Sequence, residues 1–357
     1  MRFLHCSDLH LDSRMESNLS SAQARERNTE VCMTFSRMVD YAAERHVTAV
    51  LIAGDLFDTA RVSAQTVDFV LSRIRSAPEV DFLYLRGNHD EGEDVLRGRQ
   101  LPENFKTFTE EWTYYRYGSV VVAGLELSRG NCAACYGELE LAPEDVNIVM
   151  LHGQVSTRPG QEQVAIPRLR QKHIDYLALG HIHSYQCAPL DEQSVYCYCG
   201  CLEGRGFDEC GEKGFVELTV RDNRVEHTFV PFAQRKLFEL PVDITGLITV
   251  PELQQAMEAQ TDGISRDDLV KFTLTGAYTL DTQKDLTFLQ KLFAPRFYFV
   301  KIKDESRLEI HRETYEHDIS LKGEFIRMVL ASDKTEEEKE RIICCGIQAL
   351  SGEEVRF

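Results

Sequence analysis

The sequence predicts an α/β protein whose first two thirds form one sheet-based domain. Short apolar runs rich in Val, Ile, Leu, Phe and Tyr alternate there with helix-like segments, which is the pattern of this class. Each run ends in a small polar cluster, as a buried strand does where it leaves a sheet. The chain has 357 residues, which is enough for two or three domains of about 150 residues each.

The first domain should contain short apolar strands and a long amphipathic helix. One face of that helix should pack on the sheet, because apolar residues recur at steps of three and four, at Val31, Phe35, Met38, Val39 and Ala42. From Ser194 to Val230 the pattern changes to consecutive strands separated by glycines, which predicts an antiparallel sheet edge. Strands are expected at 3–6, 49–53, 82–85, 120–123, 148–151 and 176–179.

A boundary is expected near Pro231 and the basic pair Arg235-Lys236. The segment that follows has the pattern of a compact α+β unit. Its expected elements are a strand at 238–242, a helix at 250–260, a strand at 269–275, a helix at 280–293 and a strand at 297–303.

The tail from Ile319 should form two helices. In the second helix, Thr335 and Glu338 have the spacing of a capping box, and Gly352 lies just past the expected end. One side of this helix carries the apolar residues Ile342, Ile343, Ile347 and Leu350. The sequence therefore predicts three parts, residues 1–232, 233–313 and 314–357.

Composition narrows the classes of function. No apolar run reaches the roughly 18 residues of a membrane span, and 43 % hydrophobic with 27 % charged residues is typical of a soluble globular protein. A net charge of −18 argues against a nucleic-acid partner, because phosphate contacts need Lys and Arg. The N-terminus enters a strand without a basic and apolar leader, so a cytoplasmic location is expected.

Five polar motifs directly follow apolar runs. In an α/β sheet the carboxyl ends of neighbouring strands face one crevice, so side chains from separate loops can converge there. Taken alone, Asp8-x-His10 or Gly87-Asn88-His89 is more readily interpreted as a turn with a helix cap, whereas five motifs in this order predict one site. The motifs are Asp8-Leu9-His10, Gly54-Asp55-Leu56-Phe57-Asp58, Gly87-Asn88-His89-Asp90, Leu151-His152-Gly153 and Gly180-His181-Ile182-His183.

The side chains of these motifs are carboxylates, an amide carbonyl and imidazoles. Such a mixture of oxygen and nitrogen donors suits Mn²⁺, Fe²⁺ or Zn²⁺ better than Mg²⁺ or Ca²⁺ alone. The donors exceed one four-coordinate site and fit two adjacent metal ions that share a bridging carboxylate. The other histidines are interpreted as surface or core side chains: His5, His46, His173, His227, His311 and His317.

The ordered motifs resemble those of the calcineurin-like metallophosphoesterase superfamily and, within it, the bacterial SbcD and YhaO-type DNA repair exonuclease subunits. The closer similarity also rests on the Gly204-Arg205-Gly206-Phe207 turn and on the segments 321–325 and 349–354. This resemblance implies a four-layer core of two sheets flanked by helices, then a small α+β cap and C-terminal helices. It assigns catalysis to 1–232, DNA recognition to the cap at 233–313, and partner binding to the tail at 314–357.

The resemblance also implies a role for each residue of the motifs. Asp55 would bridge two divalent ions, with Mn²⁺ expected and Fe²⁺, Zn²⁺ or Mg²⁺ as alternatives. His89 would donate to the leaving oxygen or stabilise charge on phosphorus, and Asp90 would orient that imidazole. The archaeal and eukaryotic nucleases carry a second histidine where this chain has Asp58. The first ion would be held by Asp8, His10 and His183, and the second by Asn88, His152 and His181.

The function that the resemblance implies is a 3′–5′ exonuclease and single-strand endonuclease. It would process DNA ends as a homodimer with an SMC-like coiled-coil ABC ATPase subunit. Most of the acidic excess lies in 1–232, where two divalent ions would add positive charge, so the charge predicts weak, salt-sensitive DNA binding. The expected DNA contacts are Arg205, Lys301 and Lys303, beside a basic cluster with Arg296, Arg307 and Arg312.

Two alternatives remain open for the function. A phosphoesterase for nucleotides or cyclic phosphodiesters would need the same five motifs but would gain little from the chain beyond the core. A non-catalytic scaffold subunit would be expected to lack some of the ligands, and none is missing here.

The cysteines allow two interpretations. Cys132-x-x-Cys135 and the alternating Cys197, Cys199 and Cys201, with Cys210 nearby, have groupings that structural zinc sites or redox pairs use. Alternation also places Cys197, Cys199 and Cys201 on one strand face, where they would be small buried apolar side chains. An odd total of 11 in a chain of this length favours reduced thiols over a disulfide framework.

Overall fold

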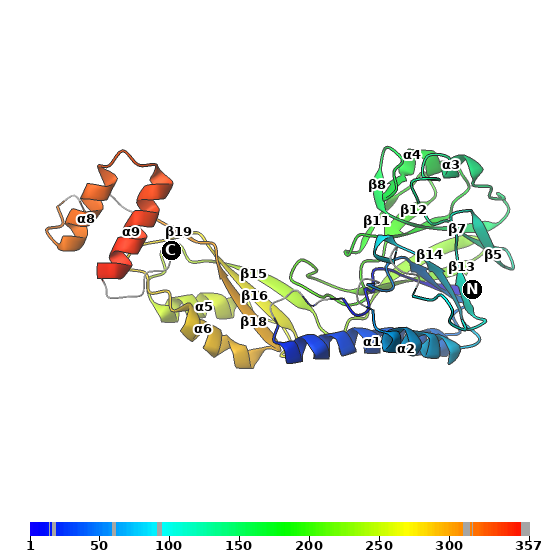
Figure 1. Ribbon diagram of the computed structural model, residues 1–357, viewed down its shortest axis with the longest axis horizontal. Helices are drawn as coiled ribbons and strands as arrows, with labels where there is room; N and C mark the ends of the chain where they lie inside the picture. The colour runs from blue at the N-terminus through cyan, green and yellow to red at the C-terminus, as the bar shows by residue number, and fades with distance from the viewer. Residues whose placement is uncertain are drawn as a thin grey trace. The chain divides into compact units, whose positions relative to one another are not determined.

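The computed structural model describes residues 1–13, 15, 19–58, 62–90, 95–309, 315 and 317–350. The chain divides into two compact units, Met1–Leu237 and Phe238–Phe357, both drawn in Figure 1. Gly352, His311 and Arg312, on which sequence-based expectations were placed, lie outside the described residues.

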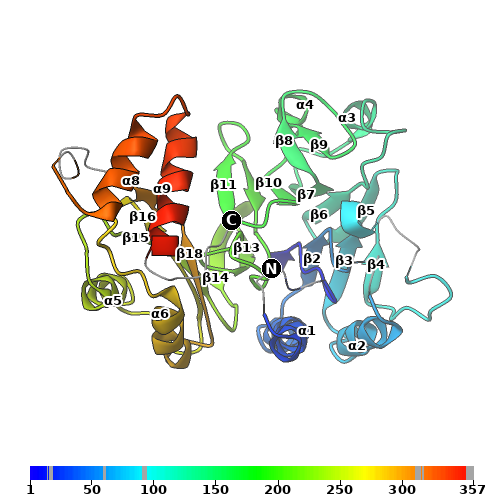
Figure 2. The ribbon, with the colours of Figure 1, turned by 60° about the vertical axis from the view of Figure 1, so that its left-hand side comes forward.

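The first unit is a sandwich of two six-stranded sheets with helices on both outer faces (Figure 2). In the first sheet β1 to β4 run parallel, and β13 and β14 add an antiparallel edge. Its order is β14 (Arg224–Pro231), β13 (Gly214–Arg221), β1 (Arg2–Cys6), β2 (Ala49–Ala53), β3 (Asp81–Leu85) and β4 (Phe105–Thr107). The order of the second is β11 (Gln186–Pro189), β12 (Val195–Tyr198), β10 (Tyr176–Gly180), β7 (Val146–His152), β6 (Val120–Gly124) and β5 (Thr113–Tyr117).

Three layers of buried apolar side chains hold this unit together. One layer lies between the first sheet and the helices α1 (Ser21–Glu44) and α2 (Ala64–Arg75). A second fills the space between the sheets. A third lies between the second sheet and the short helices α3 (Cys135–Glu138) and α4 (Ile166–Leu169), near the small sheet of β8 (Gln154–Ser156) and β9 (Gln163–Ala165). The expected four-layer core is therefore confirmed.

The sequence pattern located the main elements of this unit. All the expected strands occur, with ends within two residues of those predicted. The predicted helix is α1, and its five apolar residues are buried against the first sheet. The antiparallel edge is also confirmed, although β12 runs parallel to β10 and the two antiparallel strands after it, β13 and β14, belong to the first sheet. Cys197, Cys199 and Cys201 are buried, as their alternation predicts.

The second unit is an α+β unit with its own core. Its sheet has the order β15 (Leu237–Asp243), β16 (Leu269–Thr275), β18 (Phe299–Asp304). The helices α5 (Val250–Ala259) and α6 (Leu286–Phe293) pack on this sheet. A separate apolar cluster joins α8 (Leu321–Leu330) and α9 (Glu336–Leu350) to Leu308 of β19 (Arg307–Leu308), which pairs with β17 (Ala277–Tyr278).

Two details of the second unit can be compared with the sequence. The capping box of α9 is confirmed, because Thr335 Oγ1 accepts from the Glu338 backbone N–H and Glu338 accepts from the Thr335 backbone N–H. The helix expected from 280 begins only at Leu286. Asp285 caps its first turn by accepting from Phe288 N, and the chain before it forms a turn in which Thr282 Oγ1 bonds Thr279 N. Within the described residues, no helix has the length and apolar character needed to cross a bilayer.

Candidate metal centre

The predicted ligands lie at the carboxyl ends of strands from both sheets. Asp8 and His10 follow β1, and Asp55 follows β2. Asn88 and His89 begin the short 3₁₀ turn after β3. The second sheet contributes His152 from the end of β7 and the pair His181 and His183 after β10. The site is therefore assembled where two sheets meet, and not along the edge of one open sheet as the strand-end argument assumed.

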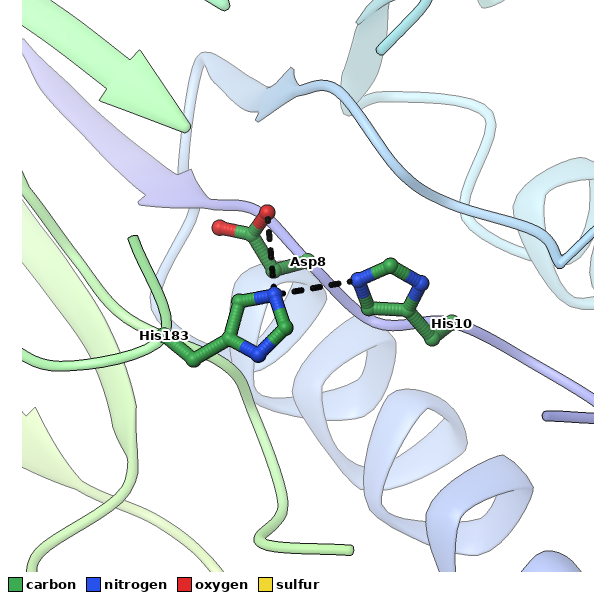
Figure 3. Close-up of side chains that lie close together, drawn as sticks. All are labelled: Asp8, His10 and His183. Carbon is green, nitrogen blue, oxygen red and sulfur yellow. Dashed lines mark hydrogen bonds and ion pairs between the residues drawn. The ribbon is translucent and has the colours of Figure 1, made fainter. Parts of the chain in front are cut away.

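One group of ligand atoms gathers around His10. The ligand atoms of Asp8, His10 and His183 lie within 4.8 Å of one another. Figure 3 shows these three side chains close together. His183 Nε2 is 3.2 Å from His10 Nε2 and 3.9 Å from Asp8 Oδ1. Two imidazole nitrogens that face each other at this distance would repel if both rings were protonated. The arrangement therefore favours a metal cation bound between them.

Asp55 links this first group to a second group of donors. Asp55 Oδ2 lies 3.6 Å from His10 Nε2 and 3.4 Å from His152 Nε2. On the far side, Asn88 Oδ1 is 3.0 Å from His152 Nε2 and 3.3 Å from His181 Nδ1. One carboxylate oxygen between two clusters of donors is the arrangement expected of a bridging ligand.

The backbone around these side chains is held in an uncommon conformation. Asp8, His10 and Asp55 have φ of 53°, 46° and 53°, in the left-handed region that costs a non-glycine residue energy. Gly54, with φ of 94°, leaves no room for a side chain, because a Cβ there would lie 2.0 Å from His152 Nδ1. Such strain in the turns after β1 and β2 aims their side chains at a common point.

Burial and neighbouring charges together set the protonation of the ligands. Burial is the main cause that lowers the pKa of His10 to about 3, with Arg205 adding to the effect, so this imidazole is neutral and able to bind a metal. Burial alone would raise the pKa of Asp55, but the hydrogen bond from His152 and the surrounding imidazoles hold it well below its usual range. Asp55 is therefore ionised at neutral pH.

His89 and Asp90 differ from each other in exposure and partners. His89 is exposed, its ring centroid lies 4.8 Å from that of His10, and its backbone N–H donates to Asp55. Asp90 is buried and accepts from the backbone N–H groups of Leu56, Phe57 and Gly87. Through these bonds Asp90 fixes the loop after β2 to the turn that carries His89.

Glu209 is a functional candidate that the strand-end argument missed. Its carboxylate accepts from His183 Nδ1 at 2.7 Å and from Arg205 Nη2 at 2.5 Å. Arg205 Nη2 also lies 3.1 Å from His183 Nδ1. Because Glu209 follows a turn and not a strand, no sequence pattern used above points to it. Arg205, expected to contact DNA, lies among the groups that orient His183.

The other two expected DNA contacts are in the second unit. Lys301 and Lys303 lie two positions apart on β18, so both point to one face of its sheet. Lys303 forms an ion pair of 2.5 Å with Glu305, and Lys271, opposite Lys301 on β16, pairs with Glu239 at 2.7 Å. This face carries basic side chains that are partly neutralised by neighbouring acids.

A polar cleft of about 280 Å³ opens beside Asn88 and His152. Its other walls include Arg86 and Glu126, which form a 2.6 Å ion pair, and Glu162. Two of the predicted ligands, Asn88 and His152, therefore line an open polar cleft.

The donor set fits divalent transition metals. It offers buried carboxylates, imidazoles and an amide oxygen, and three groups of His and Asp atoms each fall within 4.8 Å. Two of these groups contain Asp55, and two contain His10. Hard and borderline donors in this proportion are those of Mn²⁺, Fe²⁺ or Zn²⁺.

Comparison with known proteins agrees with this geometry. Residues 1–185 match the family model described as calcineurin-like phosphoesterase. An uncharacterized metallophosphoesterase of Bacillus subtilis, YhaO, is 28 % identical over 275 residues, which cover 72 % of this chain and 67 % of that protein. The DNA double-strand break repair protein Mre11 of Sulfurisphaera tokodaii is 28 % identical over 203 residues, 53 % of this chain and 51 % of that one. The SbcD component of the nuclease SbcCD of Escherichia coli K12 is 22 % identical over an alignment of 400 positions, which covers 96 % of each chain. The chain thus matches only about half the length of the archaeal relative.

Proposed function

The chain belongs to the calcineurin-like phosphoesterase family, and we propose that it is a two-metal phosphodiesterase that cuts DNA. The observation that carries the proposal is the position of Asp55 between two sets of donors, at 3.6 Å from His10 and 3.4 Å from His152. A bridging carboxylate of this kind holds two divalent ions next to each other, as the two-metal mechanism of phosphodiester hydrolysis requires.

Each side chain of the site has a part in this reaction. Asp8, His10 and His183 would hold one ion, Asn88, His152 and His181 the other, with Asp55 between them. When bound, such ions lower the pKa of a water molecule and offset charge on the phosphoryl oxygens. His89 is exposed beside His10, so it can reach the scissile phosphate and donate a proton to the leaving oxygen. Asp90 keeps the turn of His89 in place through its backbone hydrogen bonds.

DNA is favoured over a small phosphate ester by two observations. The proteins that are similar to this chain in sequence include a DNA double-strand break repair protein and a nuclease subunit. The second unit also offers a three-stranded sheet with Lys271, Lys301 and Lys303 on one face, which a small substrate does not need. We therefore propose 3′–5′ exonuclease and single-strand endonuclease activity in DNA end processing, with Mn²⁺ as the metal.

A surface on helices α8 and α9 supports the proposal that this enzyme binds a partner protein. A cavity of about 600 Å³ on their surface has an apolar floor that includes Phe325, Ile342 and Ala349, and charged side chains at Lys334, Glu338 and Arg341. Met328 of α8 is 67 % exposed. The name of the E. coli relative describes it as one subunit of a nuclease. We propose that this apolar surface binds an SMC-like coiled-coil ATPase subunit, that the enzyme is a homodimer, and that it works in the cytoplasm.

The decisive experiment compares substrates. The purified protein is incubated with Mn²⁺ and end-labelled single- and double-stranded DNA, beside bis-p-nitrophenyl phosphate. Shortening of DNA from one end together with cleavage of the ester supports the proposal. The Asp55→Ala protein is the control for contaminating nuclease and should cleave neither. Cleavage of the ester without any cleavage of DNA favours the small-substrate phosphoesterase, and cleavage of neither favours a scaffold subunit.

A further inference from the structure

A pair of cysteines and a histidine lie together where the edges of the two sheets of the first unit meet. Cys187 on β11 and His227 on β14 come from different sheets, and the Cys187 Sγ is 3.3 Å from His227 Nε2. Next to them Tyr185 and Phe229 stack with ring centroids 4.6 Å apart. Cys187 and His227 are half-buried, so a small molecule can reach this thiol.

Cys197 faces Cys187 directly on the neighbouring strand. The register of β11 and β12 pairs the two cysteines. The Leu190 backbone N–H donates to Ser194 O at 2.9 Å, which makes that pair a hydrogen-bonded one. Because pair types alternate along an antiparallel ladder, Cys187 and Cys197 form a non-hydrogen-bonded pair, whose Cα atoms are about 4.5 Å apart. Disulfides span Cα separations from about 4.4 Å upward, so the two sulfurs can be joined without moving the strands.

The surroundings activate the more accessible thiol. A hydrogen bond from Cys197, together with His227, lowers the pKa of Cys187 to about 6 against the opposing effect of burial. In Cys32, which is also half-buried, burial instead raises the pKa to about 11. Because the thiolate is the reactive form, Cys187 should react with electrophiles much faster than Cys32 at neutral pH.

We propose that Cys187 and Cys197 are a peroxide-responsive pair that closes a cross-strand disulfide at the edge of the second sheet. The Cys187 thiolate attacks one oxygen of hydrogen peroxide, the O–O bond breaks, and the departing hydroxide takes a proton from the solvent, delivered through the His227 ring, to leave as water. The sulfenic acid on Cys187 is then attacked by Cys197. The S–S bond forms as the S–O bond breaks, and the oxygen leaves as a second water with the Cys197 proton.

The order of these steps follows from the charges. The bond to the Cys187 thiolate is the main cause that raises the pKa of Cys197, so Cys197 stays protonated while Cys187 is reduced. Oxidation of Cys187 removes that negative charge and frees Cys197 to attack. The inference is independent of the metal centre and of the substrate proposed above.

The test uses the full-length protein after treatment with a chelator, exposed to equimolar hydrogen peroxide and then to an alkylating reagent. Trypsin leaves both cysteines in one peptide, because no Lys or Arg lies between Lys172 and Arg205. A protease that cuts after Glu192 separates them, so mass spectrometry can identify their crosslink. We expect the Cys187–Cys197 disulfide, reversed by dithiothreitol.

Three variants make the result specific. Cys197→Ala should stop at a sulfenic acid on Cys187 that dimedone traps, and His227→Gln should slow the oxidation of Cys187 by about tenfold or more. Cys32→Ser is the matched control and should form the disulfide at the rate of the unaltered protein. Oxidation of Cys32 as fast as Cys187, or an unchanged rate in His227→Gln, would overturn the proposal. Should Cys197→Ala fail to fold, the rates of alkylation of Cys187 and Cys32 in the unaltered protein decide the question.

Discussion

Asp55 is the side chain on which both halves of the candidate metal centre depend. Its Oδ2 approaches His10 and His152, and its Oδ1 accepts from the backbone N–H of His89. The backbone of Gly87 passes so close to Asp55 that a Cβ there would lie 2.2 Å from Asp55 Oδ1. Glycine at this position therefore leaves room for the carboxylate. By contrast, His89 is exposed, although its ring lies beside that of His10 and its ligand atom falls within 4.8 Å of those of His10 and Asp55. Replacing Asp55 and replacing His89 should therefore have different effects on metal binding and activity.

We expect Asp55→Ala to lose metal and activity together, because the donors on either side lose their shared carboxylate. His89→Ala should retain both metal ions and lower kcat by about 10²–10⁴-fold, the usual contribution of a general acid. Metal content after gel filtration and turnover of bis-p-nitrophenyl phosphate measure the two effects. A fully active His89→Ala protein would remove His89 from the reaction.

Glu209 should tune metal affinity through His183. The carboxylate fixes which ring nitrogen of His183 carries the proton, and so presents Nε2 toward Asp8 and His10. Loss of such an outer partner typically weakens metal binding by about 10–100-fold. We expect Glu209→Gln to raise the Kd for Mn²⁺ in calorimetry by that factor. Glu212→Gln, an exposed acid three residues on, is the control, and equal affinities of the two variants would contradict this role.

At the scale of single residues, the sequence identified the candidate site residues that lie at strand ends and few others. The metal-ligand candidates follow apolar runs, so a pattern of one strand and one polar turn was enough to find them. Glu209 was missed because its link to His183 is made only by folding of the Arg205 turn. The partners of Asp90 and of Cys187 were missed for the same reason, since backbone donors and cross-sheet contacts leave no spacing in the sequence.

Among the elements, α1 connects the sheet to the turn that supports the metal centre. Arg27, in its second turn, is 1 % exposed and donates to Glu30, to Glu203 and to the Gly204 carbonyl at 2.5, 3.2 and 2.8 Å. Glu30 also binds Arg235 at 2.6 Å. The amphipathic spacing of α1 predicted the apolar face of this helix but not its buried ion pairs, because charged residues are normally read as solvent-facing.

Removing Arg27 should leave Glu203 buried without its cationic partner. Loss of one member of a buried ion pair typically costs about 3–5 kcal/mol. We expect Arg27→Met to lower the free energy of unfolding by that amount in urea titrations followed by circular dichroism. Arg25→Met, an exposed position on the same helix, should change it by less than about 0.5 kcal/mol. Equal stability of the two variants would show that the buried network contributes nothing.

Glu30 adds a dependence on pH to the same helix. Burial raises its pKa, but the bonds from Arg235 and Arg27 outweigh burial and hold the pKa below its usual value. A carboxyl whose folded-state pKa is depressed stabilises the protein above its unfolded pKa and loses that effect as the pH falls. Glu30→Gln should therefore be less stable than the unaltered protein at neutral pH, and the difference should shrink below a pH of about 4. Thermal melts across this range measure it, with Glu44→Gln on α1 as control, and a gap that is independent of pH contradicts it.

For the whole molecule, a net charge of −18 has to be reconciled with a polyanionic substrate. Few of the described basic residues are proposed to contact DNA. Within the basic cluster of the second unit, Lys303 forms an ion pair with Glu305, and Arg296 forms one with Glu258. Positive charge would therefore come mainly from divalent ions held at Asp55 and its neighbours. The composition already indicated that an acidic protein would bind a polyanion poorly. The resemblance to a nuclease family suggested that bound metal ions supply the positive charge, but the sequence alone did not show where that charge would lie.

DNA binding should consequently depend on metal more than on basic side chains. With the His89→Ala protein, to prevent cleavage, we expect chelation of Mn²⁺ to raise the Kd for a single-stranded oligonucleotide by about tenfold or more. Removing two phosphate contacts by Lys301→Ala with Lys303→Ala should instead reduce the slope of log Kd against log salt by about 2 units at most. Fluorescence anisotropy between low and moderate NaCl separates these effects, because counterion release depends on salt whereas bonds to a metal depend on the metal. Binding that survives chelation and vanishes with the lysine substitutions would place the DNA on the basic sheet of the second unit and away from the metal centre.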